Sequence, residues 1–387
     1  MRGIVLAAIC WGWLSAPVAA ESLIFAPEIT AEQVRPHIEF LASPELRGRS
    51  GRGAAQAAEY MVRKFQAAGL QPLFANGSYY QDIPGARDDA GQPTVMGRNV
   101  GALLPGSDPA LRHEVIIVSA HYDHMGASGT TVFAGADDNA SGVSMVLEVA
   151  RQLAQSGRAP RRSIAFVGFD LEEKMLWGSR WFAEHSPWPL EQVKLFITAD
   201  MIGRSLGDLP LPAVFVIGSE HALHLKDALD RVGHPTGLEV ARLGVDLIGT
   251  RSDYGPFRDR QVPFLFFSSG EHPDYHTPRD TPDLIDYEKV ARVSSLVLRV
   301  SRGIGETDQP PVWQSQVPLD LDEARALERI TTLLLEAGDQ RPLSDVQRYM
   351  VSVVRKRCQS ILEKGEMTAG DRTWLIRMSQ LLLLSVF

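Results

Sequence analysis

The sequence predicts an α/β fold, in which a mainly parallel mixed sheet is covered by helices on both faces and followed by a C-terminal helical extension. Short apolar, β-branched runs without polar alternation recur along the chain, as expected for strands buried on both faces. Amphipathic helical patterns separate these runs, which is typical of parallel sheets. Acidic residues and histidines directly follow several of the runs, where open α/β sheets place their ligands.

The expected elements begin with helices and continue with strands that alternate with helices. Helices are predicted at 30–42, 54–68, 143–153, 178–184, 220–232 and 287–302. Strands are predicted at 99–104, 114–120, 163–169, 195–199, 213–217 and 262–267. The capping box formed by Thr30 and Gln33 marks where the first helix begins.

Two stretches between these elements lack a periodic pattern. The glycine- and arginine-rich segment 46–51 is interpreted as a solvated turn rather than a substrate contact. The polar segment 82–97 contains Gly and Pro and is interpreted as a connection, too short to house an inserted domain.

The N-terminus has the features of a secretory signal peptide over 1–20. Arg2 precedes a short apolar run, and Val18 and Ala20 fit the small-residue positions of a cleavage site. The apolar run is too short to span a bilayer comfortably. We therefore expect cleavage after Ala20 and an exported protein, either periplasmic or secreted.

Composition excludes several function classes. The net charge of −8 argues against nucleic acid and against an anionic membrane surface as partners. After cleavage only Cys358 remains, so no intrachain disulfide and no cysteine-based zinc finger can form. Any metal site must use His, Asp and Glu.

The chain after the signal peptide divides into a main domain at 21–305 and a helical extension at 306–387. The segment 307–311 contains two consecutive prolines and is typical of a linker. The three helical patterns beyond it lie at 320–337, 343–363 and 368–386. The leucine run at 381–384 is too short for a membrane span and is interpreted as a packed helix face.

Metal-binding residue types follow four of the predicted strands, and one more precedes a helix. Carboxylates that converge on one place repel each other strongly, and a pair of divalent cations removes that cost. One of these carboxylates can bridge two such cations, as in two-metal hydrolases. The candidate residues are His121, Asp123, Asp138, Glu172, Glu173, Asp200 and His276.

Adjacent Glu172 and Glu173 suggest a division of labour, in which one binds metal and its neighbour stays free as the base for the attacking water. Asp123, two residues after His121, suits a supporting role in which it holds the ring of His121 through the second ring nitrogen.

These residues lie in motifs that resemble family twenty-eight of the metallopeptidases, the co-catalytic zinc aminopeptidases. The resemblance covers roughly residues 30–303 and rests on six ordered motifs. They are HYDHMG at 121–126, GADDNASG at 135–142, DLEEKMLWGS at 170–179, ADMIGR at 199–204, RSDYGPF at 251–257 and YHTPRDT at 275–281. The earlier FLASPELRGRSG at 40–51 and YYQDI at 79–83 also look like that family.

The resemblance implies two zinc ions per chain and a peptide substrate. It implies that Asp138, Glu173 and His276 hold one zinc ion. It implies that His121, Asp138 and Asp200 hold the other, so that Asp138 bridges the pair.

The same resemblance assigns catalytic positions. Glu172 matches the general base, and Asp137 is expected to support its neighbouring ligand. Tyr275 and Arg251 match positions that help hold the substrate carbonyl and its developing oxyanion. The chain departs from the family at Tyr254, where a histidine is usual, although no ligand is lost by that change.

The other histidines are interpreted as surface or satisfied side chains. The matched pattern does not need His124 as a ligand, although it lies close in sequence to His121. The remaining ones are His37, His113, His185, His221, His224, His234 and His272.

The resemblance therefore favours an exported zinc-dependent aminopeptidase, and other functions remain open. A related di-zinc carboxypeptidase or deacylase would use a similar ligand order. The deacylases normally carry a lid domain between ligands, whereas the 76 residues from Asp200 to His276 (276 − 200) follow an α/β pattern. A glutaminyl cyclase-like acyl transferase shares the fold but uses one zinc ion. A non-catalytic peptide-binding protein is the least favoured reading, because no essential group is missing.

Overall fold

The computed structural model describes residues 23–338 and 343–386. The predicted signal peptide at 1–20 and its cleavage site lie outside the described residues. Within those two ranges, nine strands form one sheet in the order β13-β10-β14-β9-β5-β8-β4-β2, with β3 paired to β4. The strands are β2 Gln71–Pro72, β3 Tyr80–Arg87, β4 Pro93–Leu104, β5 Val115–His121, β8 Ser163–Phe169, β9 Val193–Ala199, β10 Ala213–Ile217, β13 Glu239–Leu243 and β14 Phe264–Ser268.

The centre of the sheet is parallel, because β14, β9, β5 and β8 all run in one direction. Antiparallel pairs occur where β10 meets β14 and where β4 meets β8. The prediction of a mainly parallel mixed sheet is therefore confirmed. Short two-stranded pairs lie outside it: β1 Ile24–Phe25 with β12 His234–Pro235, β6 Ala127–Ser128 with β7 Thr131–Val132, and β11 Ala222–Leu223 with β15 Val312–Trp313.

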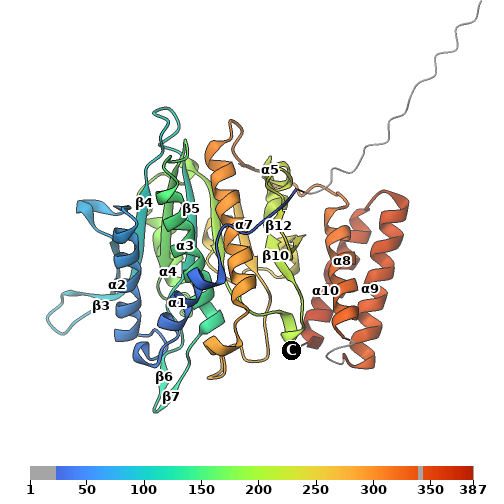
Figure 1. Ribbon diagram of the computed structural model, residues 1–387, viewed down its shortest axis with the longest axis horizontal. Coiled ribbons are helices and arrows are strands. Elements are labelled where there is room, and N and C mark those ends of the chain that lie inside the picture. Colours follow the sequence, from blue (N-terminus) through green and yellow to red (C-terminus); the bar gives the residue numbers. More distant parts are fainter. Residues whose placement is uncertain (1–22, 339–342, 387) are drawn as a thin grey trace, which may run out of the picture.

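Helices cover both faces of the sheet (Figure 1), as predicted. Alternate residues of β5 show why: Ile116 and Val118 join one apolar cluster, whereas Val115 and Ile117 join another. The first cluster includes residues of α1 Ala31–Leu41, α2 Arg52–Ala67, α3 Gly142–Gln155, α5 Leu225–Val232 and α7 Tyr287–Glu306. The second includes residues of α4 Trp177–Glu184 and α6 Gly255–Arg258.

The segment 82–97 is not the connection that its polar composition predicts. It forms most of the β3–β4 hairpin, in which Asp82 pairs with Arg98 and Ile83 with Gly97. Most of its side chains are exposed, and Ile83 is the buried exception on β3. A solvated hairpin buries too little apolar surface to impose a strand pattern on its sequence.

The predicted helix at 220–232 is shorter than expected and begins at Leu225. The carboxylate of the buried Glu220 accepts hydrogen bonds from the backbone N–H groups of Gly218 (3.0 Å) and Val245 (2.7 Å). These bonds hold 219–221 in a short turn, which leads into β11 instead of a helix.

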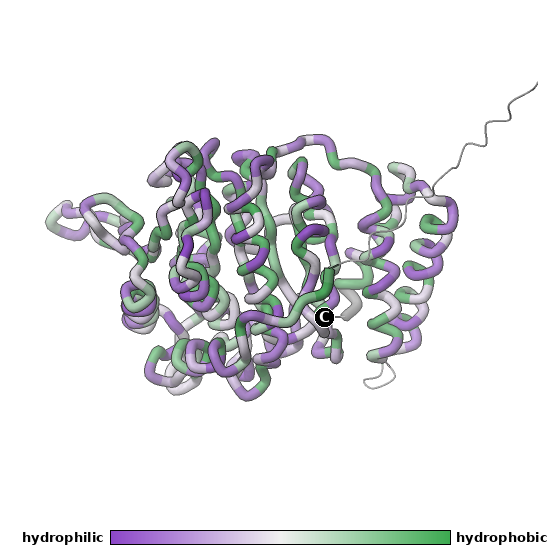
Figure 2. Tube along the Cα trace, turned by 45° about the horizontal axis from the view of Figure 1, so that its top comes forward, coloured by the Kyte–Doolittle hydropathy of each residue, from purple (hydrophilic) through white to green (hydrophobic). Residues whose placement is uncertain are grey.

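The C-terminal extension consists of α8 Asp322–Ala337, α9 Asp345–Lys364 and α10 Ala369–Val386, which stand beside the β13 edge of the sheet (Figure 1). Green and purple segments alternate along these helices (Figure 2), as expected for helices with one apolar face. Ile330 shares an apolar cluster with Ala241 of β13, and Leu327 shares another with Phe264. The division into domains at 21–305 and 306–387 stays a prediction. None of the helices in the described ranges has the length and apolarity needed to cross a membrane.

Candidate metal centre

The predicted ligands lie on loops that leave one edge of the sheet. His121 is the last residue of β5, Asp200 directly follows β9, and Glu172 and Glu173 follow the end of β8. The loop after β14 carries His276, and the turn Ala136–Ser141 before α3 carries Asp138. Because these strands are parallel neighbours, their carboxyl ends bring the loops together as the sequence predicts.

Asp138 lies between the two predicted metal positions. Its Oδ1 is 3.3 Å from Nε2 of His121, which is 3.4 Å from Oδ1 of Asp200. Its Oδ2 is 3.2 Å from Nε2 of His276, which is 3.1 Å from Oε2 of Glu173. Each oxygen of this buried carboxylate therefore faces a separate group of ligands, which is the arrangement expected of a bridging residue.

The spacing of these donor atoms, 3.1–3.4 Å, is close to the separation of neighbouring ligand atoms around a metal ion. Nε2 of His276 is buried and has no hydrogen-bond partner among the described residues, although two carboxylate oxygens lie close to it. Tetrahedral zinc with bonds of about 2.0–2.2 Å separates neighbouring ligand atoms by roughly 3.3–3.6 Å. Two groups of possible ligands lie within the described ranges: His121, Glu172 and Asp200, and His124, Asp138 and Glu173.

Glu172 and Glu173 differ in electrostatic environment although they are neighbours. Burial raises the pKa of Glu172 well above its ordinary value, Asp200 and Asp253 raise it further, and His121 opposes the rise. Burial also opposes ionisation of Glu173, but its contacts with His124 and His276 lower its pKa to about 2. The pKa values of the two neighbouring carboxyl groups are therefore shifted in opposite directions, and their division into base and ligand stays a prediction.

Buried carboxylates that are not predicted ligands connect the loops. Asp123 accepts hydrogen bonds from the backbone N–H groups of Glu172 (3.0 Å) and Glu173 (3.4 Å). Its main-chain oxygen lies 3.3 Å from Nδ1 of His121, and its Oδ1 lies 3.6 Å from the same nitrogen. Asp123 therefore lies against the His121 ring and ties that loop to the Glu172–Glu173 loop, and its supporting role stays a prediction.

Asp137 and Asp280 make equivalent connections on the other side of the centre. Asp280 accepts from the backbone N–H groups of Asp137 (2.9 Å) and Asp138 (3.0 Å). Asp137 accepts from those of Gly203 (2.6 Å) and Arg204 (3.1 Å). The supporting role expected of Asp137 rests on these bonds. Asp280 is not among the residues predicted from the sequence, although it lies four residues after His276 within the same motif.

The interpretation of 46–51 as a solvated turn is wrong for Arg49. Its side chain is fully buried and donates five hydrogen bonds to main-chain oxygens of the surrounding loops. The acceptors are Leu41 (2.9 Å), Tyr122 (2.8 Å), Ala134 (2.7 Å), Gly135 (2.8 Å) and Asp138 (3.1 Å). A single guanidinium thus joins the His121 and Asp138 loops, and it offsets part of the negative charge of the nearby carboxylates.

The two predicted substrate-binding residues lie in different surroundings. The ring of Tyr275 stacks on that of His276 at 3.8 Å between centroids, which places it beside the centre. Arg251 is 63% exposed and pairs with Glu271 at 3.6 Å. Tyr254, at the position where histidine is usual, is buried against Phe264 and donates a hydrogen bond to the Gly249 carbonyl.

Two histidines interpreted as bystanders lie beside the centre. Nδ1 of His124 is 2.8 Å from Oε1 of Glu173. The buried His272 lies 3.6 Å from Asp137, and its Nδ1 accepts a hydrogen bond from the Asp274 backbone N–H. His37 is satisfied as expected, because its ring contacts Tyr60 and Glu148.

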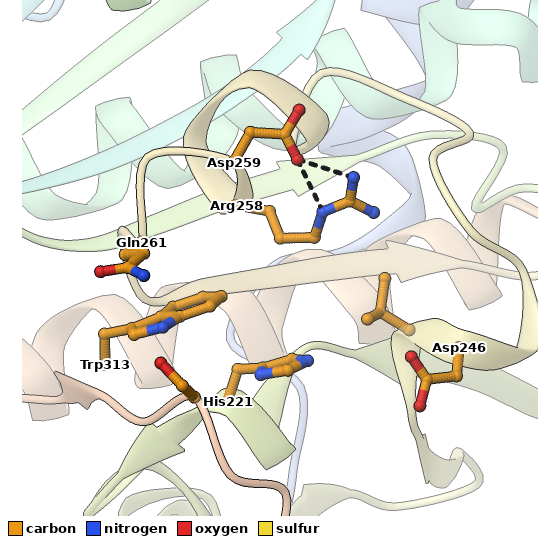
Figure 3. A pocket seen from close by; sticks show the side chains of 8 residues that line it. His221, Asp246, Arg258, Asp259, Gln261 and Trp313 are labelled. Atoms are coloured by element: carbon orange, nitrogen blue, oxygen red, sulfur yellow. Dashed lines mark hydrogen bonds and ion pairs between the residues drawn. The ribbon is translucent and has the colours of Figure 1, made fainter.

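A separate cavity of about 360 Å³ lies near the amino end of β14 (Figure 3). His221 stacks on Trp313 in this cavity, and Arg258 donates to Asp259 at 2.7 Å. The full lining is His221, Val245, Asp246, Arg258, Asp259, Gln261, Trp313 and Ser315. None of the predicted site residues belongs to it, and its charged groups pair with protein groups.

The structure is an α/β protein whose strand-end loops bring candidate metal-binding residues together. Comparison with known sequences agrees, because the profile of Peptidase family M28 matches residues 99–301. The chain belongs to this peptidase family.

Two characterised relatives match part of their length. Leupeptin-inactivating enzyme 1 of Streptomyces exfoliatus is 27% identical over 270 residues, which cover 66% of this chain and 53% of that protein. Aminopeptidase YwaD of Bacillus subtilis is 29% identical over 196 residues, which cover 48% of this chain and 40% of that protein. The chain thus spans about half the length of these curated relatives.

Among solved structures, the zinc aminopeptidase BSAP of Bacillus subtilis has a TM-score of 0.55 and 16% sequence identity. The match covers 76% of this chain and all of that one. At this identity the comparison shows that the fold is shared.

Proposed function

We propose that the protein is an exported zinc-dependent aminopeptidase that hydrolyses the N-terminal peptide bond of peptides. The observation that carries the proposal is Asp138, whose two oxygens face separate groups of ligands in a member of Peptidase family M28. The names of the aminopeptidase relatives support the same reading.

The proposal includes two zinc ions per chain. Asp138, Glu173 and His276 hold one, and His121, Asp138 and Asp200 hold the other. Zinc, when bound, supplies Lewis acidity that polarises a peptide carbonyl and activates water. The five side chains suit zinc because they offer only imidazole nitrogen and carboxylate oxygen.

Glu172 is proposed as the general base, which takes a proton from the attacking water and gives it to the leaving amine. Its carboxylate lies in one ligand group with His121 and Asp200, within 4.8 Å of their donor atoms. Tyr275, stacked beside the centre, and Arg251, on the loop before α6, are proposed to hold the substrate carbonyl as negative charge develops.

The structure disfavours the deacylase and the glutaminyl cyclase-like acyl transferase. Between Asp200 and His276, β10, β13 and β14 all belong to the main sheet, so this stretch is not a separate lid domain of the deacylase kind. A single-zinc acyl transferase would not need a carboxylate with both oxygens facing imidazole groups, as Asp138 has.

The test compares peptides that differ only in a free or an N-acetylated amino terminus. We expect release of the first amino acid from the free peptide, loss of that release after chelation, and little cleavage of the blocked peptide. Equal rates on both peptides would contradict an aminopeptidase. Removal of residues from the carboxyl end would instead support the related carboxypeptidase.

We also propose export, on the basis of the signal-like sequence at 1–20. N-terminal sequencing of protein from the native host should find a chain that begins near Glu21. An intact Met1 on the mature protein would refute this part of the proposal.

A further inference from the structure

His124 contacts the metal centre although the ligand pattern does not need it. Its side chain is fully buried, and Nδ1 lies 2.8 Å from Oε1 of Glu173 and 3.6 Å from Oδ2 of Asp138. The other carboxylate oxygen of Glu173, Oε2, lies 3.1 Å from Nε2 of His276. The two oxygens of Glu173 therefore face two different histidines.

The chemistry of the close contact indicates which ring nitrogen carries hydrogen. A carboxylate oxygen accepts hydrogen bonds, so Nδ1 of His124 must be the donor to Glu173. In that tautomer Nε2 is a bare acceptor, and it has no hydrogen-bond partner within the described part of the chain. A buried nitrogen without hydrogen is more tolerable than a buried N–H without an acceptor.

The same nitrogen argues that His124 is not itself a ligand. A histidine that binds metal usually donates its second N–H to an acceptor that fixes the ring. His121 has such a partner, because its Nδ1 faces the main-chain oxygen of Asp123 at 3.3 Å. Nε2 of His124 is buried and has none among the described residues, so we infer that His124 acts as a partner of Glu173 and not as a ligand.

Close packing fixes the direction of the His124 ring. A Cβ atom added at Gly135 would lie 2.6 Å from Cδ2 of His124 and 2.7 Å from Nη2 of Arg49. Gly135 also has a φ of +61°, a backbone conformation that favours glycine. The ring of His276 meets that of His124 edge-on at 5.8 Å between centroids. The ring is thus held between the Gly135 turn and His276, with Nδ1 toward Glu173.

We propose that His124 is a positioning residue of the metal centre. By donating from Nδ1 to Oε1, it leaves Oε2 of Glu173 as the oxygen directed toward His276. His124 thereby sets the zinc affinity of the position held by Asp138, Glu173 and His276. The inference rests on the proposed function, because it assumes that Glu173 and His276 hold a zinc ion.

The test measures zinc affinity of metal-free protein against a chromophoric chelator, with cobalt absorption spectra as a second readout. His124→Asn keeps an N–H donor close to the Nδ1 position but is a poor zinc ligand. We expect the zinc affinity of this variant to stay within about threefold of the wild-type value at both metal positions. His124→Ala should lose about 10–100-fold in zinc affinity at the position held by Glu173 and His276, which is the usual effect of removing a supporting partner.

His124→Gln covers the case in which the alanine variant does not fold, because it fills the space but places its amide near Nε2. It should lose affinity as the alanine variant does. His113→Ala, at an exposed histidine, is the matched control and should match the wild type. Thermal unfolding of the metal-free variants separates general destabilisation from a metal effect.

Two results would overturn the inference while leaving the proposed function intact. If His124→Asn loses as much affinity as His124→Ala and changes the cobalt spectrum, His124 is a ligand. If His124→Ala binds zinc as the wild type does, the contact with Glu173 has no role. Failure of the wild type to bind zinc at either position would instead refute the proposed function, and this inference with it.

Discussion

Replacement of Arg49 by lysine should destabilise the protein strongly. The guanidinium donates five hydrogen bonds to main-chain oxygens, at 2.7–3.1 Å. A lysine ammonium has three donors, so at least two buried carbonyl groups lose their partner. At about 1.5–3 kcal/mol for each hydrogen bond to a charged group, the free energy of unfolding should fall by about 3–6 kcal/mol.

The assay is urea unfolding of the metal-free protein, followed at fixed pH by circular dichroism. The matched control is Arg47→Lys in the same loop, because the Arg47 side chain is exposed and donates one hydrogen bond within the described residues, to the Gly129 carbonyl at 3.3 Å. That variant should stay within about 0.5 kcal/mol of the wild type. Equal unfolding midpoints for the two variants would refute the claim that Arg49 holds the loops together.

Three further predictions follow from the site and its supports. Glu172→Gln should keep both zinc ions and lose about 10²–10⁴-fold in kcat, whereas Glu173→Gln should lose zinc as well as activity. Metal analysis and kinetics of both variants test this assignment, and the reverse pattern would exchange the roles of base and ligand. Asp280→Asn should weaken zinc binding, because its carboxylate accepts from the backbone of Asp137 and Asp138; unchanged affinity in a chelator competition would contradict this. Burial lowers the pKa of Lys289 from 10.5 to about 8. Between pH 8 and pH 10.5 the unfolded chain therefore binds more protons than the folded chain, and the free energy of unfolding rises with pH. Lys289→Met should remove that rise, and parallel curves of stability against pH for the variant and the wild type would contradict it.

The sequence predicts the centre of the fold because burial on both faces leaves a strong pattern. The strand expected at 163–169 is β8 itself, and the one expected at 195–199 lies within β9. The placement of His121, Asp200 and Glu173 follows from β5, β9 and β8, because the carboxyl ends of parallel strands meet at one edge of the sheet. The hairpin of β3 and β4 leaves no such pattern, since most of its side chains face solvent.

Arg49, His124 and Asp280 could not be placed in the same way. Each acts through contacts with residues far away in the sequence, such as Arg49 with Ala134 or Asp280 with Asp137. An arginine in a glycine-rich loop has the same composition whether it is solvated or buried, and its neighbours decide which. His124 lies within a matched motif, yet only the position of Glu173 shows that the two are partners.

The zinc content of the purified wild-type protein, after dialysis against metal-free buffer, tests the two-metal centre most directly. We predict about two zinc ions per chain, because Asp138 offers one oxygen to each group of ligands. Chelation should remove both ions and abolish aminopeptidase activity, and added zinc should restore it. A single tightly bound zinc ion, or full activity of metal-free protein, would contradict the two-metal centre.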